Sequence, residues 1–344
     1  MKKLVMGAAM MSLLLAGCGG NSADDKQQLV VSTWGLSQDV WEETIKVPFE
    51  EKFNAELVLD IGGTNDRYTK LESNPNSGID VIELSQSAAA NGYEAGLFET
   101  VDYSKIPNAT NLIDAAASLT DSGFGPAYTV NSIGIIYDPA VVGFEITSWS
   151  DLWKPELAGK VSIPDITTTF GPAMVHLASD YAGVDITTDN GAAAFKALEE
   201  LKPNLVKTYA KSSDLANMFA AGEIQVAIVA DYGVPMITEA VPSAEFIVPE
   251  GTYANFNTID IVANSENKDL AYEYINFRLD AALQTETAVA LNEAPVNKEV
   301  VLDEATAVNK TYGEVAAAAK SIDYSFVNPL LNDWIDQWNR LINN

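Results

Sequence analysis

The chain of 344 residues is poor in cysteine, histidine and positive charge. Its one cysteine, Cys18, excludes an intramolecular disulfide, and its one histidine, His176, excludes a metal site built from several cysteine and histidine ligands. Only 20 Lys and Arg stand against 48 Asp and Glu, which gives a formal net charge of −28. This balance argues against nucleic acid and anionic lipid as partners, because both are bound by clustered basic side chains. The acidic excess suits either steering of a positively charged molecule or a solvated surface in a saline habitat.

Signatures of the common enzyme classes are also missing. The sequence contains no nucleophile elbow, phosphate-binding loop or dinucleotide fingerprint. His176 lies within an apolar stretch of helical spacing, which favours a packing role over a catalytic one. We therefore expect a protein that is not an enzyme and that carries no metal or other cofactor.

After residue 28 no apolar run is long enough to span a bilayer, and the N-terminus has its own character. Residues 1–18 combine Lys2 and Lys3, a short apolar core and small residues, as a secretory signal does. The end of this segment, Leu-Ala-Gly-Cys, resembles a bacterial lipobox, which implies that Cys18 is the lipidated first residue of the mature chain. Residues 19–28 are polar and suit a tether. We expect an exported protein, anchored by lipid in the periplasm or on the outer face of the cell membrane.

The mature chain alternates predicted strands and helices. Strands are expected at 29–35, 55–61 and 79–84, separated by helices at 38–53 and from residue 68. This order predicts a parallel sheet with right-handed crossovers. A second α/β unit follows, with strands at 128–137, 160–164 and 224–230 and helices at 173–181, 190–201 and 213–221. A later strand at 258–262 comes after that complete unit, so the second unit is predicted to be inserted into the first.

Several segments together resemble one protein family. Residues 148–153 (SWSDLW), 157–161 (LAGKV), 131–137 (NSIGIIY) and 293–297 (EAPVN) resemble stretches of the spermidine/putrescine-type periplasmic binding proteins of ABC importers. The likeness covers nearly the whole mature chain, and the order and spacing of the segments carry it. It implies an α/β, two-lobed, type II periplasmic-binding-protein fold of the Venus flytrap kind, with a cleft between the lobes.

This resemblance also implies how the chain is divided and what it does. Lobe 1 is expected at 29–131 and 258–300, lobe 2 at 132–257, and C-terminal helices bracing the lobes at 301–344. The expected function is to capture a small amine-bearing solute by closure of the lobes and to pass it to the permease subunits of an ABC importer, as a monomer. Alternatives on the same fold are a receptor for another small anion or for ferric iron, and a sensory or enzymatic module.

Candidate ligand-binding residues follow predicted strands, because ligands of α/β sheets lie beyond the carboxyl ends of strands. Trp34 ends the first strand, and Tyr253 and Phe256 lie near the return crossing between the lobes. Aromatic faces attract alkylammonium ligands through apolar and cation–π contact. Asn255 and Asn257 stand where the resemblance implies a tryptophan and an aspartate, and an amide cannot neutralise an ammonium group.

The remaining candidates combine hydroxyl groups and carboxylates. Thr167, Thr168 and Thr169 precede a helix, where they either bind an anion or cap the helix. Asp231 and Tyr232 follow the strand at 224–230, and Asp231 either holds an amine or caps a helix. Together these sites suggest a zwitterion such as an ω-amino acid. A polyamine stays possible if Asp231 and Asp165 replace the missing carboxylates. Two further candidates, Ser85 and Ser87, follow the strand at 79–84.

Overall fold

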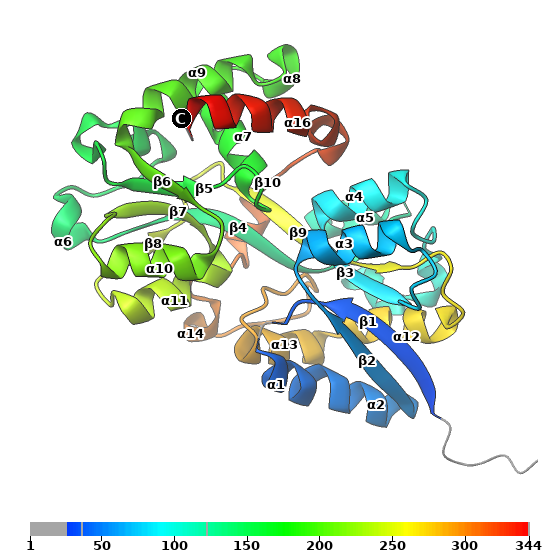
Figure 1. Ribbon diagram of the computed structural model, residues 1–344. Helices are drawn as coiled ribbons and strands as arrows, with labels where there is room; N and C mark the ends of the chain where they lie inside the picture. Colours follow the sequence, from blue (N-terminus) through cyan, green and yellow to red (C-terminus); the bar gives the residue numbers. More distant parts are fainter. Residues whose placement is uncertain (1–25, 36, 122, 343–344) are drawn as a thin grey trace, which may run out of the picture.

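The computed structural model describes residues 26–35, 37–121 and 123–342, which form two α/β lobes (Figure 1). The predicted signal, Cys18 and most of the predicted tether lie outside the described residues. Within the described part, no helix is both long and apolar enough to cross a membrane.

The first lobe is built on three parallel strands in the order β2-β1-β3. They are β1 (Gln27–Thr33), β2 (Ala55–Ile61) and β3 (Val81–Ser85). The strand predicted at 55–61 is confirmed to the residue. The helix predicted at 38–53 is also present, although its middle turn, Glu42–Lys46, is π-helical just before Pro48, which has no N–H to donate. On either side of that turn lie α1 (Gln38–Trp41) and α2 (Val47–Phe53). The other helices of this lobe are α3 (Thr64–Ser73), α4 (Gln86–Glu94), α5 (Asp114–Thr120), α12 (Lys268–Arg278) and α13 (Ala281–Ala290).

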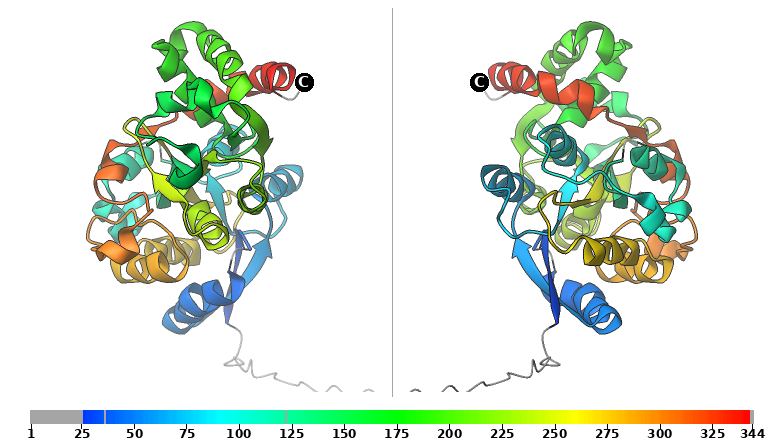
Figure 2. Two further views of the ribbon diagram at one scale, coloured as in Figure 1. Left: turned by 90° about the vertical axis from the view of Figure 1, so that its left-hand side faces the viewer. Right: turned by 90° about the vertical axis from the view of Figure 1, so that its right-hand side faces the viewer.

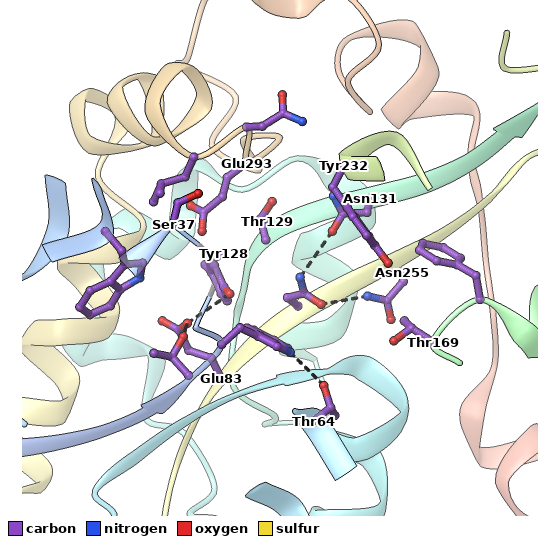
Figure 3. Close-up of a pocket in the computed structure, with 17 residues that line it drawn as sticks. Ser37, Thr64, Glu83, Tyr128, Thr129, Asn131, Thr169, Tyr232, Asn255 and Glu293 are labelled. Carbon is purple, nitrogen blue, oxygen red and sulfur yellow. Dashed lines mark hydrogen bonds between the residues drawn. The ribbon is translucent and has the colours of Figure 1, made fainter. Parts of the chain in front are cut away.

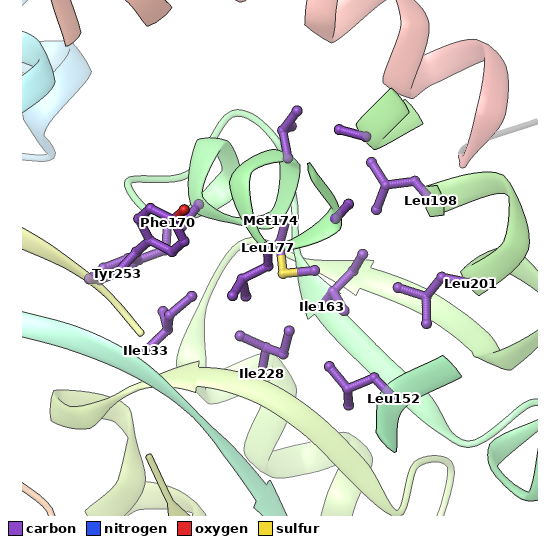
Figure 4. Close-up of a cluster of buried hydrophobic side chains, with 14 of the residues drawn as sticks. Ile133, Leu152, Ile163, Phe170, Met174, Leu177, Leu198, Leu201, Ile228 and Tyr253 are labelled. Carbon is purple, nitrogen blue, oxygen red and sulfur yellow. The ribbon is translucent and has the colours of Figure 1, made fainter. Parts of the chain in front are cut away.

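The second lobe contains β5 (Val161–Pro164), β6 (Leu205–Tyr209), β7 (Val226–Ala230) and β8 (Glu245–Ile247). The sequence analysis missed β6, a partly exposed edge strand whose polar residues give no apolar run. A tightly packed apolar core, with Met174 and Leu177 among its members, lies between this sheet and its helices (Figure 4). Those helices are α6 (Pro139–Val142), α7 (Gly171–Ala182), α8 (Ile186–Asp189), α9 (Ala192–Leu201), α10 (Ser212–Ala220) and α11 (Val234–Ala240).

Two long strands are shared by the lobes. β4 (Ala127–Tyr137) and β9 (Tyr253–Ile261) pair with each other in antiparallel fashion. β9 then pairs with β3 of the first lobe, whereas residues 133–137 of β4 pair with β7 and β8 of the second. β4 is buried along its whole length. β4 thus pairs with strands of both lobes, and β9 links β4 to β3 of the first lobe. The two strands are therefore the elements about which the lobes can move.

The C-terminal part of the chain touches both lobes. Short elements α14 (Glu304–Ala307), α15 (Glu314–Ala318) and β10 (Lys320–Ser321) lead into α16 (Tyr324–Leu341), which lies against α9 in Figures 1 and 2. Trp334 and Trp338 of α16 are buried in the core of the second lobe. Asn328 of the same helix bonds across to α4 of the first lobe, where Ser87 Oγ lies 3.1 Å from its Oδ1. The residue boundaries predicted for the lobes stay a prediction.

Candidate functional site

A cleft of about 230 Å³ lies where the crossing strands pass between the lobes (Figure 3). Its walls come from the first lobe, from β4 and β9, and from the second lobe. The residues that line it are Thr33, Trp34, Ser37, Trp41, Thr64, Glu83, Tyr128, Thr129, Asn131, Thr169, Phe170, Tyr232, Asn255, Asn257, Leu291, Asn292 and Glu293. Five predicted site residues are thus brought together here: Trp34, Thr169, Tyr232, Asn255 and Asn257.

A buried carboxylate, Glu83 of β3, lies at the first-lobe end of the cleft. It accepts hydrogen bonds from Thr33 Oγ1 at 2.6 Å, Tyr274 Oη at 2.8 Å and Tyr128 Oη at 3.2 Å. Arg278 Nε lies 3.4 Å from Glu83 Oε1, and both side chains are 1% exposed. These contacts hold the Glu83 carboxylate in one position. Arg278, at 3.4 Å, is the cationic partner that offsets part of its negative charge.

The same arginine also binds a second carboxylate of the cleft. Arg278 Nη2 lies 3.1 Å from Oε1 of Glu293, whose side chain is 20% exposed. Burial lowers the pKa of the Arg278 guanidinium, but the charges of Glu293 and Glu83 outweigh this and raise the pKa well above its usual value. The three ion-paired side chains, two carboxylates and one guanidinium, sum to a formal charge of −1. The buried Arg67 guanidinium behind Trp34 also interacts electrostatically with Glu83, but it is not within ion-pair distance of either carboxylate. This end of the cleft therefore favours a positively charged group.

Trp34 forms an aromatic wall of the cleft, and contacts with Thr64 and Arg67 fix its indole ring. Its Nε1 donates to Thr64 Oγ1 at 3.1 Å, and the guanidinium of Arg67 lies 4.7 Å from the ring centroid. Arg67 is buried and donates to the carbonyl oxygens of Ser32 and Gly62, both at 2.9 Å. The indole is therefore fixed before any ligand arrives, which lowers the entropy cost of using it as a binding surface.

Three amides follow the crossing strands along the middle of the cleft (Figure 3). Asn255 Nδ2 donates to Asn257 Oδ1 at 3.0 Å, and Asn257 Nδ2 donates to Asn131 Oδ1 at 3.4 Å. Asn255 Oδ1 is buried and has no hydrogen-bond partner within the described part of the chain. Since a buried polar atom normally has a partner, this unpaired acceptor beside the cleft indicates a donor group that the described chain does not supply.

The structure corrects the expected anion site at the three threonines. Thr167 N and Oγ1 donate to Asp165 Oδ1 at 3.1 and 2.7 Å, and Thr168 Oγ1 donates to the Asp165 carbonyl oxygen at 2.7 Å. Thr208 Oγ1 donates to the other Asp165 oxygen at 3.2 Å. Asp165 and Thr167 therefore stabilise the turn before α7 and do not line the cleft. Thr168 lines a smaller adjoining pocket, and Thr169 alone of the three reaches the main cleft.

Asp231 is a second correction, because it is buried beside the cleft and does not line it. Its carboxylate accepts from Asn131 Nδ2 at 3.0 Å, from Tyr232 N at 2.8 Å, and from both N and Oγ1 of Thr311. Burial raises the pKa of Asp231 to about 6, against the lowering effect of these bonds. Asp231 thus joins the second lobe to the C-terminal segment and positions the neighbouring Tyr232.

Four other candidates also lie away from the cleft walls. Tyr253 donates to Asp180 Oδ2 at 2.9 Å and belongs to the core of the second lobe. Phe256 alternates with the cleft-facing amides and is therefore directed into the core of the first lobe. Ser85 is buried where β3 ends, opposite Asn257. The Ser87 hydroxyl donates a hydrogen bond to Asn328 Oδ1.

Sequence reasoning missed the charged cluster of Glu83, Arg278 and Glu293. One signal was present, because Glu83 is an acid within the apolar run IDVIEL, and an acid in a buried strand needs a partner. Nothing in the sequence pairs it with Arg278, 195 positions later by the numbering. Glu293 opens the EAPVN segment that carried part of the family resemblance, but no role was assigned to it.

Comparison with known proteins places the chain in a family. A profile described as bacterial extracellular solute-binding protein matches residues 44–316. The spermidine/putrescine-binding periplasmic protein 1 of Haemophilus influenzae is 27% identical over 311 residues, covering 85% of this chain and 84% of its own. The putrescine-binding periplasmic protein SpuD of Pseudomonas aeruginosa is 28% identical over 305 residues, covering 81% and 82%.

Solved structures agree with this placement. The crystal structure of an ABC transporter from Clostridium perfringens shares 57% identity, covers 92% of this chain and 100% of its own, and superposes with a TM-score of 0.86. The spermidine/putrescine substrate-binding protein PotD of Streptococcus pneumoniae shares 18% identity and the fold, with a TM-score of 0.76 and coverage of 92% and 99%. The predicted two-lobed fold and family are confirmed: the chain belongs to the bacterial extracellular solute-binding proteins.

Proposed function

We propose that this solute-binding protein is the receptor of an ABC importer and that its ligand is a small aliphatic amine. The observation that carries the proposal is the cluster of Glu83, Glu293 and Arg278, whose formal charge of −1 lies at the cleft. A desolvated ammonium group needs such a charged acceptor, and a cleft that closes strengthens the attraction. The role is one of capture and transfer to permease subunits, without catalysis.

The size and lining of the cleft support the same class of ligand. Its volume of about 230 Å³ is below the roughly 300–1,000 Å³ typical of sites for drug-sized molecules. Trp34, Phe170 and Tyr232 offer aromatic surface for a short methylene chain. The names of the curated relatives, which state that they bind putrescine or spermidine, point to amines as well.

Calorimetric titration tests this function on protein that has been unfolded, washed free of bound solute and refolded. We expect putrescine, 4-aminobutyrate or a related short amine to bind, and Glu293→Gln to weaken that binding by about 10- to 150-fold, the value of a charge-assisted hydrogen bond. Glu299→Gln, which changes charge equally at an exposed position off the cleft, is the matched control. If no short amine binds, or if Glu293→Gln weakens binding no more than Glu299→Gln does, the proposed amine function is wrong.

We further propose that the chain is exported and anchored through Cys18, and that it acts as a monomer because one chain supplies every wall of the cleft. Cys18→Ala should move the protein from the membrane fraction to the soluble fraction and abolish incorporation of labelled fatty acid. Unchanged acylation in that variant would contradict the anchor.

Sedimentation of the mature protein at micromolar concentration should give one species of monomer mass, and a stable dimer would contradict the monomer.

A further inference from the structure

The two ends of the cleft differ in charge, and we propose that this difference selects an amine with a single positive charge, whose far end is neutral or anionic. A diamine is the disfavoured ligand. The inference rests on the proposed function, since it assumes that an ammonium group binds at the Glu83 and Glu293 end. It narrows the ligand within the small aliphatic amines.

The first-lobe end has room for one added positive charge. Glu83 and Glu293 share Arg278, so one ammonium group brings the cluster from −1 to zero. Glu293 is the more exposed carboxylate and is directed toward the cleft together with Glu83 and Tyr128 (Figure 3). The first ammonium group of any ligand would bind here.

The second-lobe end is built differently. Its lining residues are Thr169, Phe170 and Tyr232, and among the described residues that line the cleft none from this lobe carries a carboxylate. A side pocket of about 40 Å³ continues past these residues and adds the hydroxyls of Ser212 and Tyr209. Helices α7 and α10 begin beside it, at Gly171 and Ser212, and the N-terminus of a helix repels a cation.

The two second-lobe carboxylates nearest in sequence to these walls already accept hydrogen bonds from protein groups. Asp165 accepts from Thr167 and Thr208, and Asp231 accepts from Asn131, Tyr232 and Thr311. Turning the Asp231 carboxylate toward a ligand would leave its donors unpaired in a buried region, which is costly. Turning the half-buried Asp165 would break the hydrogen bonds that hold the turn before α7. A second ammonium group would therefore lack a charged acceptor.

An unpaired acceptor in the middle of the cleft independently indicates that a ligand donates a hydrogen bond there. Asn255 lines the cleft and is 1% exposed, and its buried Oδ1 has no hydrogen-bond partner in the described structure. Together with Asn131 and Asn257 it offers polar groups without charge. An amide accepts one N–H or O–H group, but it cannot neutralise a second ammonium in a closed cleft.

Three ligands with the same four-carbon chain test the selection: putrescine, 4-aminobutan-1-ol and 4-aminobutyrate. Each is titrated by calorimetry at pH 7 into refolded protein freed of bound solute. We expect the aminoalcohol or the amino acid to bind at least about tenfold more tightly than putrescine, because only the diamine leaves a charge unpaired. Putrescine binding as tightly as the better of the other two would overturn the proposal.

A change of one residue should reverse the preference. Thr169→Asp adds a carboxylate at the second-lobe end, so we expect tighter putrescine binding and at least tenfold weaker 4-aminobutyrate binding. Ser213→Asp is the matched control, because it adds the same charge at an exposed position that does not line the cleft. If Thr169→Asp shifts the ratio of the two affinities no more than Ser213→Asp does, the selection by charge is wrong.

Failure of this inference is distinguishable from failure of the proposed function. If putrescine is preferred and Glu293→Gln still abolishes its binding, the cleft binds amines and only the single-charge selection is overturned. If none of the three ligands binds, or if Glu293→Gln has no effect on binding, the amine function and the selection are both overturned.

Discussion

Two buried carboxylates lie near the cleft, and they are held in opposite ways. Glu83 is the middle residue of β3 in the first lobe, and Asp231 directly follows β7 in the second. Glu83 lines the cleft and has a guanidinium partner in Arg278. Asp231 has no cationic partner among its hydrogen bonds, and its oxygens are taken up by Asn131, the Tyr232 N–H and Thr311.

The comparison teaches that a buried carboxylate beside the cleft can bind a ligand only if its neighbours do not already satisfy it. Thr311, from a segment about 80 residues beyond Asp231, closes that carboxylate with two hydrogen bonds. Glu83 meets tyrosine and threonine hydroxyls, but the cluster around it keeps a net negative charge toward the cleft. Both carboxylates are buried, and their tertiary partners decide the role of each.

The largest expected effect comes from Glu83→Gln. The change leaves Arg278 buried with one carboxylate partner instead of two, so we expect a loss of about 3 kcal/mol of unfolding free energy, as for a broken buried ion pair. Amine binding should weaken at least 100-fold, because the cluster becomes neutral. Urea unfolding and calorimetry measure the two quantities. Wild-type affinity in a folded variant would show that Glu83 is structural only.

Asp231→Asn should be milder. An amide in place of the carboxylate presents an N–H group to donors such as the Thr311 N–H, yet it also removes a buried charge without a cationic partner. We expect a loss of about 1–2 kcal/mol in urea unfolding and amine affinity within about threefold of wild type. If Asp231→Asn weakens binding as much as Glu83→Gln does, then Asp231 is a ligand-binding carboxylate and the comparison fails.

The pH dependence of stability sharpens the same contrast. Burial raises the pKa values of Asp231 and Asp260 from 3.8 to about 6, so the folded state binds protons more readily than the unfolded state. Each group therefore stabilises the fold as pH falls, by about 1 kcal/mol between pH 7.5 and pH 5.5. Asp151, whose pKa is lowered to about 2 by its bonds with Lys154, Thr147 and Ser148 despite burial, acts oppositely, but only near and below pH 4.

Urea unfolding at the two pH values checks this effect. Burial lowers the pKa of His176, which opposes the gain in stability over this pH range in wild type and variant alike. The difference between the two proteins isolates Asp231: on going from pH 7.5 to pH 5.5, the free energy of unfolding of wild type should change more favourably than that of Asp231→Asn. An identical change in both proteins would mean that the burial of Asp231 has no electrostatic cost.

The smallest effect concerns the contact between α4 and α16. Asn328 exchanges hydrogen bonds with Ser87 and Asn91 across the lobes, at 3.1 and 2.7 Å. Asn328→Ala should weaken ligand affinity by about threefold, less than 1 kcal/mol, because it removes partly buried polar contacts without touching the cleft. Asn332→Ala, at an exposed position on the same helix, is the control. A loss of tenfold or more would mean that this contact contributes to closure more than the cleft lining does.

Much of the fold could be predicted from the sequence, because apolar periodicity reports burial directly. Residues 55–61 and 128–137 alternate or cluster apolar side chains as strands do, and both are strands in the structure. The order of the elements gave the parallel sheet and the family. Helix α4 was missed, because its sequence QSAAANGYE has little apolar contrast between its faces.

Placement at the cleft could be predicted from the sequence where a residue's own position on its strand determines the direction of its side chain. Trp34 ends β1, and Asn255 and Asn257 alternate with the buried Phe256 on β9, so local geometry places all three at the cleft. Prediction failed for Asp231, Thr167 and Ser87, whose polar atoms are claimed by Thr311, Asp165 and Asn328.

The sequence by itself determined the α/β alternation, the acidic character and the family, because these follow from residue type and order. Only the tertiary structure decided which carboxylates face the ligand. Glu83, Arg278 and Glu293 come from β3, the end of α12 and the loop after α13, and they meet only when those elements pack. A side chain's charge is a local property, but the partners that neutralise it or leave it open are set by contacts between residues far apart in the chain.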